Sequence, residues 1–232
     1  FTNLFRKNDL NSDIQEQIDQ GAGVFFRWVW EKEKTEIYAE YNYDDSKLNL
    51  RDLLLDDDSA RGSTMGIKKI LENSKNIYEI AWEWTKMEQS GSRLLRGGGS
   101  WYRHAFVRHG YTNNGEILGA SIGPGSNSHY LSIKKLNDKN QIGLALEIVE
   151  NDNDFYYAAF QNAGDFRRYW KDFNLHLTFT KRYKNFWLSS RFAYLRSLNY
   201  QWELEDFAND YYHPGRDISN FHLSINLSYF VK

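Results

Sequence analysis

The chain has 232 residues and a formal net charge of −2, so its charge gives no basic bias that would favour nucleic acid as a partner. None of its segments reaches the roughly 18 consecutive apolar residues of a transmembrane helix, and the absence of cysteine leaves neither a disulfide framework nor a thiolate metal site. Aromatic residues make up 17% of the chain, and rings with one polar edge are favoured at membrane interfaces and on carbohydrate-binding surfaces.

The N-terminal part of the sequence changes character at residue 21. Residues 1–20 are polar, lack the basic and apolar run of a signal peptide, and predict a loop or short helix. Because the chain starts at Phe1, we expect either that a signal was removed or that the chain begins partway through a longer protein. From Gly21 to Trp30 every second residue is apolar, and Ile37 to Tyr43 alternates in the same way. These two segments predict a β-hairpin.

A longer connection, Asp44 to Ala60, follows this hairpin. Its Leu48 to Leu55 part predicts a helical turn or two, and its acidic run, Asp56 to Asp58, lacks the ligand spacing and turn glycine of a Ca²⁺ loop, so a solvated loop is expected. Two further hairpins are then predicted by alternation. They are Arg61 to Leu71 with Asn76 to Met87, and His129 to Leu136 with Gln141 to Val149.

The last third of the sequence predicts longer strands. Residues 150–166 are expected to form a polar turn and about one turn of helix at the end of the sheet. Alternation returns from Phe173 to Thr180 and from Phe186 to Leu195, and it is cleanest from Phe221 to Val231. A strand of about eleven residues is long enough to cross a bilayer at the tilt of a barrel.

The strand faces and the connections together favour an all-β, antiparallel transmembrane outer-membrane β-barrel. Each strand has one apolar and one polar face, and rings such as Trp28 and Trp30 lie near strand ends, as at membrane interfaces. Short connections alternate with long ones, which is typical of periplasmic turns and outer loops. The count of about nine strands gives no antiparallel pairing of first with last, so closure within this chain is expected to be incomplete. A soluble all-β sheet remains the alternative, because alternation alone does not identify the solvent.

The stretch from Trp101 to Ser128 has no steady apolar period and is dense in aromatic, basic, amide and glycine residues. Its glycines and proline predict tight backbone turns: Gly110, Gly115, Gly119, Gly123, Pro124 and Gly125. Its candidate polysaccharide-binding residues supply stacking faces and hydrogen-bonding groups: Trp101, Tyr102, Arg103, His104, Arg108, Tyr111, Asn113 and Asn127. The alternative is a loop, residues 89–128, that plugs the lumen with its polar groups satisfying one another. The two interpretations are compatible for the segment as a whole.

This stretch resembles the Wzi capsule-assembly family, in the form common in Bacteroidetes-like bacteria. The matching residues are Trp101, Tyr102, His104, Gly110, Tyr111, Thr112, Gly115, Leu118, Gly119 and Ile122 to Asn127. The resemblance implies an 18-stranded outer-membrane barrel that acts as a lectin and attaches capsular polysaccharide to the cell surface. Residues 1–232 would then form a single barrel domain, the later half of a longer barrel. The implied partners are outer-membrane lipid, lipopolysaccharide, polysaccharide and other outer-membrane proteins.

Evidence for metal or catalytic chemistry is lacking in the sequence. His104, His109 and His129 fit no ligand spacing, so no metal is expected. Glu79 and Glu83 share a strand face about 13 Å apart, too far for a glycosidase pair. With no phosphate loop and no nucleophile motif, we expect no cofactor and no enzyme activity.

Polar strand residues are expected to fill the lumen as structural groups rather than to select solutes. They are Arg27, Glu36, Glu40, Lys68, Glu79, Glu83, His176 and Arg191. Two other functions stay open. One is an accessory barrel subunit of a larger outer-membrane export, uptake or assembly complex, and the other is a diffusion porin with an open lumen.

Overall fold

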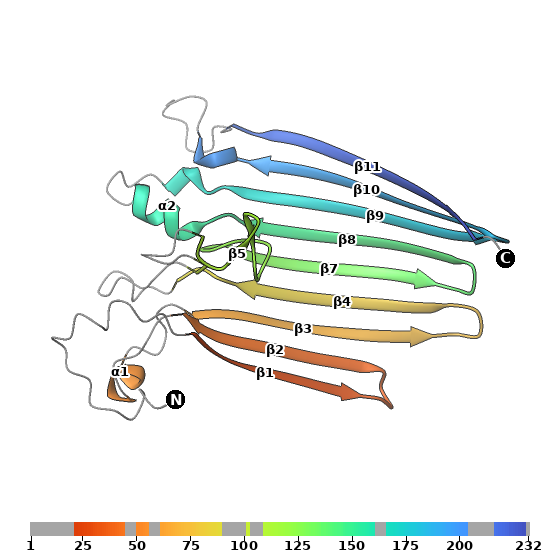
Figure 1. The fold of residues 1–232 in the computed structure, drawn as a ribbon, viewed down its shortest axis with the longest axis horizontal. Helices are drawn as coiled ribbons and strands as arrows, with labels where there is room; N and C mark the ends of the chain where they lie inside the picture. Colours follow the sequence, from red (N-terminus) through yellow and green to blue (C-terminus); the bar gives the residue numbers. More distant parts are fainter. Residues whose placement is uncertain are drawn as a thin grey trace.

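The computed structural model describes residues 21–44, 50–55, 61–89, 101–102, 109–160, 166–203 and 216–230. Its main feature is one antiparallel sheet of nine strands in the order β1-β2-β3-β4-β7-β8-β9-β10-β11 (Figure 1). The strands are β1 (Gly21–Trp30), β2 (Thr35–Asp44), β3 (Arg61–Glu72), β4 (Ile77–Lys86), β7 (Asn127–Leu136), β8 (Asn140–Glu150), β9 (Lys171–Tyr183), β10 (Phe186–Leu198) and β11 (Ile218–Tyr229). Around the sheet lie α1 (Leu50–Leu55), the two-residue strands β5 (Thr112–Asn113) and β6 (Glu116–Ile117), α2 (Asn153–Phe160), and the 3₁₀ turns η5 (Phe166–Arg168) and η6 (Tyr200–Trp202).

The register sorts side chains into two faces, because successive residues of a strand point to opposite sides. One continuous row crosses all nine strands on the apolar face: Trp28, Ile37, Ile67, Trp82, Leu131, Leu146, Leu175, Tyr194 and Phe221. The neighbouring row lies on the polar face: Arg27, Tyr38, Gly66, Glu83, Tyr130, Glu147, Asn174, Leu195 and Asn220. The two-faced strands predicted from the alternation are therefore confirmed.

No second layer covers the apolar face within the described residues. Phe221 is 74% exposed and Leu223 62%, and the buried hydrophobic residues are few, with Tyr156 the largest of them. A contiguous apolar surface of this extent is stable against hydrocarbon rather than water. Paired rings lie toward both ends of this face, as with Tyr41 and Tyr43 at one end and Phe186 and Tyr229 at the other.

The two ends of the sheet differ in their connections. At the end that we call the turn end, tight turns at 31–34, 73–76, 137–139 and 184–185 join the strands. The opposite end, which we call the loop end, carries the long connections together with α1, α2 and the β5–β6 hairpin (Figure 1). This alternation of short and long connections is that of an outer-membrane barrel.

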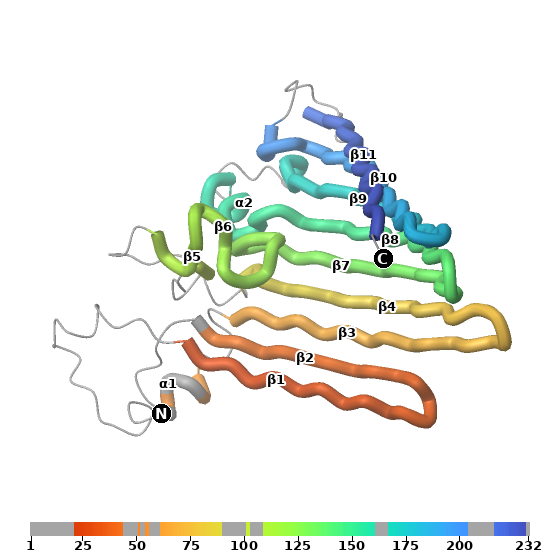
Figure 2. The backbone as a smooth tube through the Cα atoms, turned by 45° about the vertical axis from the view of Figure 1, so that its right-hand side comes forward, coloured from red at the N-terminus to blue at the C-terminus, as the bar shows by residue number. Residues whose placement is uncertain are grey.

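The sheet does not close on itself within the described residues. β1 and β11 are its two edge strands, and each pairs with one neighbour only. Figure 2 shows a single twisted layer with the β5–β6 hairpin lying against it near β7 and β8. The expectation of about nine strands without first-to-last pairing is confirmed.

The structure differs from the sequence-based expectation at the loop end. α2 has 8 residues rather than about one turn, and the β5–β6 hairpin had no strand prediction. Two-residue strands are too short for a period-2 pattern to register. No described helix is long and apolar enough to cross a membrane.

Candidate functional site

The β5–β6 hairpin shapes the segment between residues 109 and 126. Asn114 and Gly115 occupy its tip with φ of 51° and 83°. Positive φ at both positions is what a two-residue type I′ turn requires, and Asn-Gly is its preferred sequence. The Leu118 amide donates to the Tyr111 carbonyl at 2.9 Å, and the Tyr111 amide donates to the Tyr102 carbonyl at 3.2 Å, so the hairpin is tied to the aromatic pair that precedes it.

Trp101 and Tyr102 lie between this hairpin and the sheet. The Ala120 amide donates to the Tyr102 hydroxyl at 2.9 Å. Gly119 is so close to the Tyr102 ring that an added Cβ would lie 2.5 Å from Cε1. A Cβ added to Gly62 of β3 would lie 3.2 Å from Cζ2 of Trp101, which places the indole directly on the strand. The chain is therefore folded back over the polar face.

The base of the segment is fixed to β4 and α2. The Met87 amide donates to the Ser126 carbonyl at 2.8 Å, and the Asn153 amide donates to the Gly125 carbonyl at 2.8 Å. The Ser126 hydroxyl, in a residue only 2% exposed, accepts from the Asp152 amide at 3.0 Å. Buried backbone groups need such partners, and here the partners come from two separate segments.

A hydrogen-bonded network next to this base joins the ends of four elements. The side-chain amide of Asn127 donates to the carboxylates of Glu88 at 2.6 Å and Glu150 at 3.2 Å. The side-chain amide of Asn153 donates to the same two carboxylates at 3.2 and 3.4 Å. Lys171 donates to the other oxygen of Glu150 at 2.6 Å. Asn127 is thus a buried structural residue that holds the start of β7.

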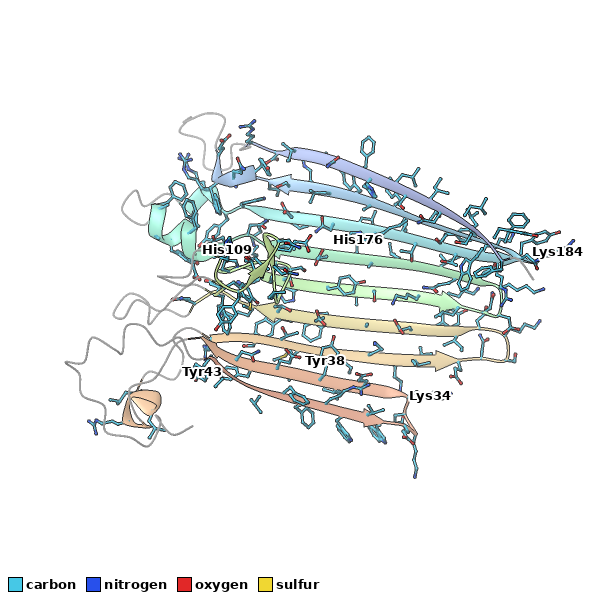
Figure 3. The ribbon with its side chains drawn as sticks, viewed as in Figure 1. Lys34, Tyr38, Tyr43, His109, His176 and Lys184 are labelled. Atoms are coloured by element: carbon cyan, nitrogen blue, oxygen red, sulfur yellow. The ribbon has the colours of Figure 1, made fainter. Side chains whose placement is uncertain are left out.

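A cavity of about 680 Å³ lies between the segment and the polar face. Such a volume lies within the range of small-molecule sites. Trp101, Tyr102, Leu118 and Ile122 line it from the segment. The sheet contributes polar residues, among them Tyr38, Glu40, Lys68, Glu79, Glu83, Tyr130, Lys134 and Glu147. Figure 3 shows Tyr38 on the sheet between its two ends.

Many of the cavity's charged groups are already paired. The Tyr38 hydroxyl donates to Glu83, and Lys134 donates to Glu79 at 2.8 Å. Glu147 accepts from Asn174 at 3.0 Å. Charge-assisted hydrogen bonds of this kind are stronger than neutral ones, so they fix the shape of the cavity floor.

A smaller cavity of about 390 Å³ continues along the sheet. It shares Tyr130, Ser132, Lys134 and Glu147 with the first and is also lined by His176 and Arg191. The sequence predicted the polar faces of these strands correctly, since six of the eight expected lumen residues line one of the two cavities. The other two, Arg27 and Glu36, pair with each other at 2.7 Å.

An aromatic cluster at the loop end was missed by the sequence interpretation. The Trp170 indole donates to Asp172 and to Ser197, both at 2.8 Å, and packs edge-on against Trp202 at 5.1 Å between centroids. Phe155 of α2 lies 4.4 Å from Trp202. The cluster joins residues 155–160, 169–170 and 200–202, and only the density of rings in those stretches signals it.

Tyr169 and η6 complete this cluster. Burial, with the hydrogen bond to the Tyr157 hydroxyl, raises the pKa of the Tyr169 phenol above its ordinary value. Asn199, Gln201 and Trp202 all have positive φ, between 52° and 58°. The Asn199 amide fixes this unusual turn by donating to the carbonyls of Arg167 and Tyr169, each at 2.9 Å.

The candidate ligand residues are only partly brought together. Trp101 and Tyr102 line the large cavity, whereas Tyr111 and Asn113 are exposed on the hairpin away from it, and Asn127 is engaged in the network above. Arg103, His104 and Arg108 lie outside the described residues. Four of the predicted turn glycines have positive φ: Gly110, Gly115, Gly123 and Gly125.

Metal-ligating residues do not cluster in the described part of the chain. No group of three or more His, Asp or Glu side chains stands close enough there to hold an ion. His129 projects from the apolar face, with its ring near those of Trp82 and Trp84.

Comparison with known proteins shows the family to which the chain belongs. The family model described as Capsule assembly protein Wzi matches residues 2–212. The chain belongs to the Wzi capsule assembly family. Among solved structures it is similar, with a TM-score of 0.62 and 14% identity, to Wzi from Escherichia coli, an outer-membrane protein of group 1 capsule assembly described as a carbohydrate-binding β-barrel. The match covers 91% of this chain and 42% of that one. A search of curated proteins finds no match.

Membership in the Wzi family fits the geometry of the sheet. The apolar face, the rings toward its ends and the alternating connection lengths are those of an outer-membrane β-barrel, and this Wzi-family chain is an outer-membrane protein. The chain spans less than half the length of the Wzi structure that it matches. Its correspondence to the later half of such a barrel stays a prediction.

Proposed function

We propose that this protein is a lectin-like barrel that binds capsular polysaccharide or exopolysaccharide at the outer surface of the outer membrane. The observation that carries the proposal is the large cavity between the segment and the polar face, with Trp101 and Tyr102 on one side and hydrogen-bonding strand residues on the other. The family match, and the carbohydrate binding of the similar Wzi barrel, supports the same ligand class.

The chemistry of the cavity suits a sugar. Ring faces pack against the C–H face of a pyranose, and hydroxyl groups need donors and acceptors placed around its rim. Tyr130, Ser132 and Glu40 supply such groups without a strong charge of one sign. Arg103 and His104 follow Tyr102 directly and Arg108 comes six residues after it, and we include the three in the proposed surface. The proposal assigns binding and no catalytic step.

Binding to capsular polysaccharide purified from the source bacterium tests this function. The polysaccharide is immobilised, and association of the full-length folded protein is followed in detergent. Trp101→Ala should weaken binding about three- to tenfold, the loss expected for one stacked ring. Trp28→Ala is the matched control, because it removes an indole from the apolar face and leaves the cavity unchanged.

Equal binding by Trp101→Ala and Trp28→Ala would place the ligand away from the cavity. If the wild-type protein binds no polysaccharide, the lectin proposal fails and an accessory role in a larger outer-membrane complex takes its place. A third outcome, an open pore, predicts single-channel conductance in planar bilayers, whereas the lectin proposal expects a filled lumen with conductance near zero.

A further inference from the structure

The turn end of the sheet is strongly basic. Its residues 30–35, 69–78, 135–142 and 179–188 contain nine cationic and four acidic side chains. The cations are Lys32, Lys34, Lys69, Lys75, Lys135, Lys139, Lys181, Arg182 and Lys184, and the acids are Glu31, Glu33, Glu72 and Asp138. The whole chain has a net charge of −2, so this surplus is local.

Ion pairs neutralise only part of this surplus. Lys34 pairs with Glu72, and Lys69 lies 3.5 Å from Glu33. Lys135, Lys139, Lys181 and Lys184 are exposed and make no ion pair with the residues that the structure describes. We call these four side chains the basic rim.

The basic rim borders the apolar face. Lys135 and Lys181 point to the same side of the sheet as Ile133 and Leu177 and lie two and four residues beyond them. Lys139 and Lys184 lie in the tight turns just beyond the strands. Figure 3 labels Lys184 at this end, and Lys34 at the same end on the β1–β2 turn, several strands away.

Aromatic rings lie beside these ammonium groups. The Lys135 Nζ is 5.9 Å from the centre of the Tyr78 ring, and the Lys184 Nζ is 5.6 Å from that of Tyr183. Tyrosine at the border of an apolar band marks the level of lipid head groups. The lysines are therefore placed at the depth of the phosphates, because long side chains extend from the apolar border toward the polar layer.

Two cations at the loop end are paired instead. There Lys171 pairs with Glu150 at 2.6 Å and Arg196 pairs with Asp217 at 3.0 Å. Lys171 and Arg196, two cations near the loop-end border of the apolar face, are thus neutralised within the protein, whereas the lysines of the basic rim are left for an external anion.

We propose that the basic rim binds the phosphates of anionic phospholipids in the leaflet at the turn end. Neighbouring strands are about 4.8 Å apart, and Lys181 lies two residues along β9 from Phe179, which shares a row with Lys135. Lys135 on β7 and Lys181 on β9 therefore stand about 12 Å apart, a spacing that suits one or two head groups. Short turns lie on the periplasmic side of such barrels, where the leaflet consists of phospholipid. Charge complementarity selects phosphatidylglycerol over zwitterionic lipid. The proposal depends on the membrane location and not on polysaccharide binding.

Quenching of tryptophan fluorescence by brominated lipids tests the proposal. The full-length protein is reconstituted in vesicles of phosphatidylcholine with increasing dibrominated phosphatidylglycerol, and in matched vesicles with dibrominated phosphatidylcholine. Trp30 and Trp187 report from the turn end. We expect a relative association constant above one in favour of phosphatidylglycerol, by about fivefold for each lysine that contacts a lipid phosphate.

Two quadruple variants decide the result. Replacing all four rim lysines by Gln should reduce the preference to about one, and replacing them by Arg should retain it, because Arg preserves the charge. Raising the salt concentration should lower the wild-type preference. The shift of the folded band on unheated gels shows that both variants are folded.

Three outcomes would overturn the proposal. The first is a relative association constant of one for the wild-type protein, which means no preference for phosphatidylglycerol. The second is a relative association constant in the Gln variant equal to that of the wild-type protein. The third concerns the other source of membrane phosphate, lipid A. If the Gln variant loses retention of purified lipid A in detergent while its preference for phosphatidylglycerol is unchanged, the rim is a lipopolysaccharide site instead.

Discussion

The segment between residues 109 and 126 is attached to α2 at Gly125, so Gly125→Ala is expected to destabilise the protein. Gly125 is buried, has a φ of 67°, and a Cβ there would lie 2.4 Å from an Asp152 oxygen and 3.2 Å from the Asp154 amide nitrogen. The Asp152 side chain can rotate away, but the Asp154 backbone cannot move without α2.

Two costs add at this position. A left-handed backbone with a Cβ costs about 1–2 kcal/mol, and forcing a methyl group into a packed site costs about 1–3 kcal/mol more. Gly115→Ala separates them, because Gly115 has a φ of 83° and no atom within 4 Å of its added Cβ. We therefore expect about 2–5 kcal/mol for Gly125→Ala and about 1–2 kcal/mol for Gly115→Ala.

Urea unfolding of the vesicle-reconstituted protein, followed by tryptophan fluorescence, measures both free energies. Limited proteolysis measures local opening of the segment in case it unfolds before the sheet. Gly125→Ala should also weaken polysaccharide binding, since it displaces the segment that carries Trp101. If the two variants lose the same stability, the segment is not packed against α2 and the reasoning is refuted.

Three further predictions concern other parts of the sheet. Ile225→Arg on the apolar face should destabilise the folded protein in vesicles by about 2–4 kcal/mol if it lies near the bilayer midplane, and the folded fraction on gels should fall. Asn226→Arg on the polar face should change that folded fraction far less. Tyr38→Phe removes a hydrogen bond to the Glu83 carboxylate and should lower the urea unfolding free energy by about 1–2 kcal/mol, with Phe retaining the ring's packing on Gly66. Asn199→Ala loses two carbonyl hydrogen bonds at a positive φ, and hydrogen exchange should show faster opening of η6 with the rest of the sheet unchanged.

The strands could be predicted because each alternates over its full length. The segment Gly21 to Trp30 was predicted with the bounds of β1, and other strands were predicted to within a few residues. Alternation also assigned Glu40, Glu83 and Arg191 to the polar face, because a period of two leaves only two choices of face. The short turns followed from the same pattern, since an antiparallel neighbour needs only a few residues to connect.

The site depended on contacts between segments far apart in the chain. The sequence indicated that Trp101 and Asn127 belong to one binding stretch, but the fold places Trp101 in the cavity and buries Asn127 against Glu88 and Glu150. Similarly, Phe155, Trp170 and Trp202 meet only because β8, β9 and β10 end side by side.

The sequence by itself therefore determined the two-faced, all-β architecture, since strand period and turn residues are local properties. The tertiary structure decided which rings form a cavity wall, which amides are structural anchors and where unpaired lysines gather. These features depend on the register between strands and on the path of the connections, and local sequence patterns determine neither of them.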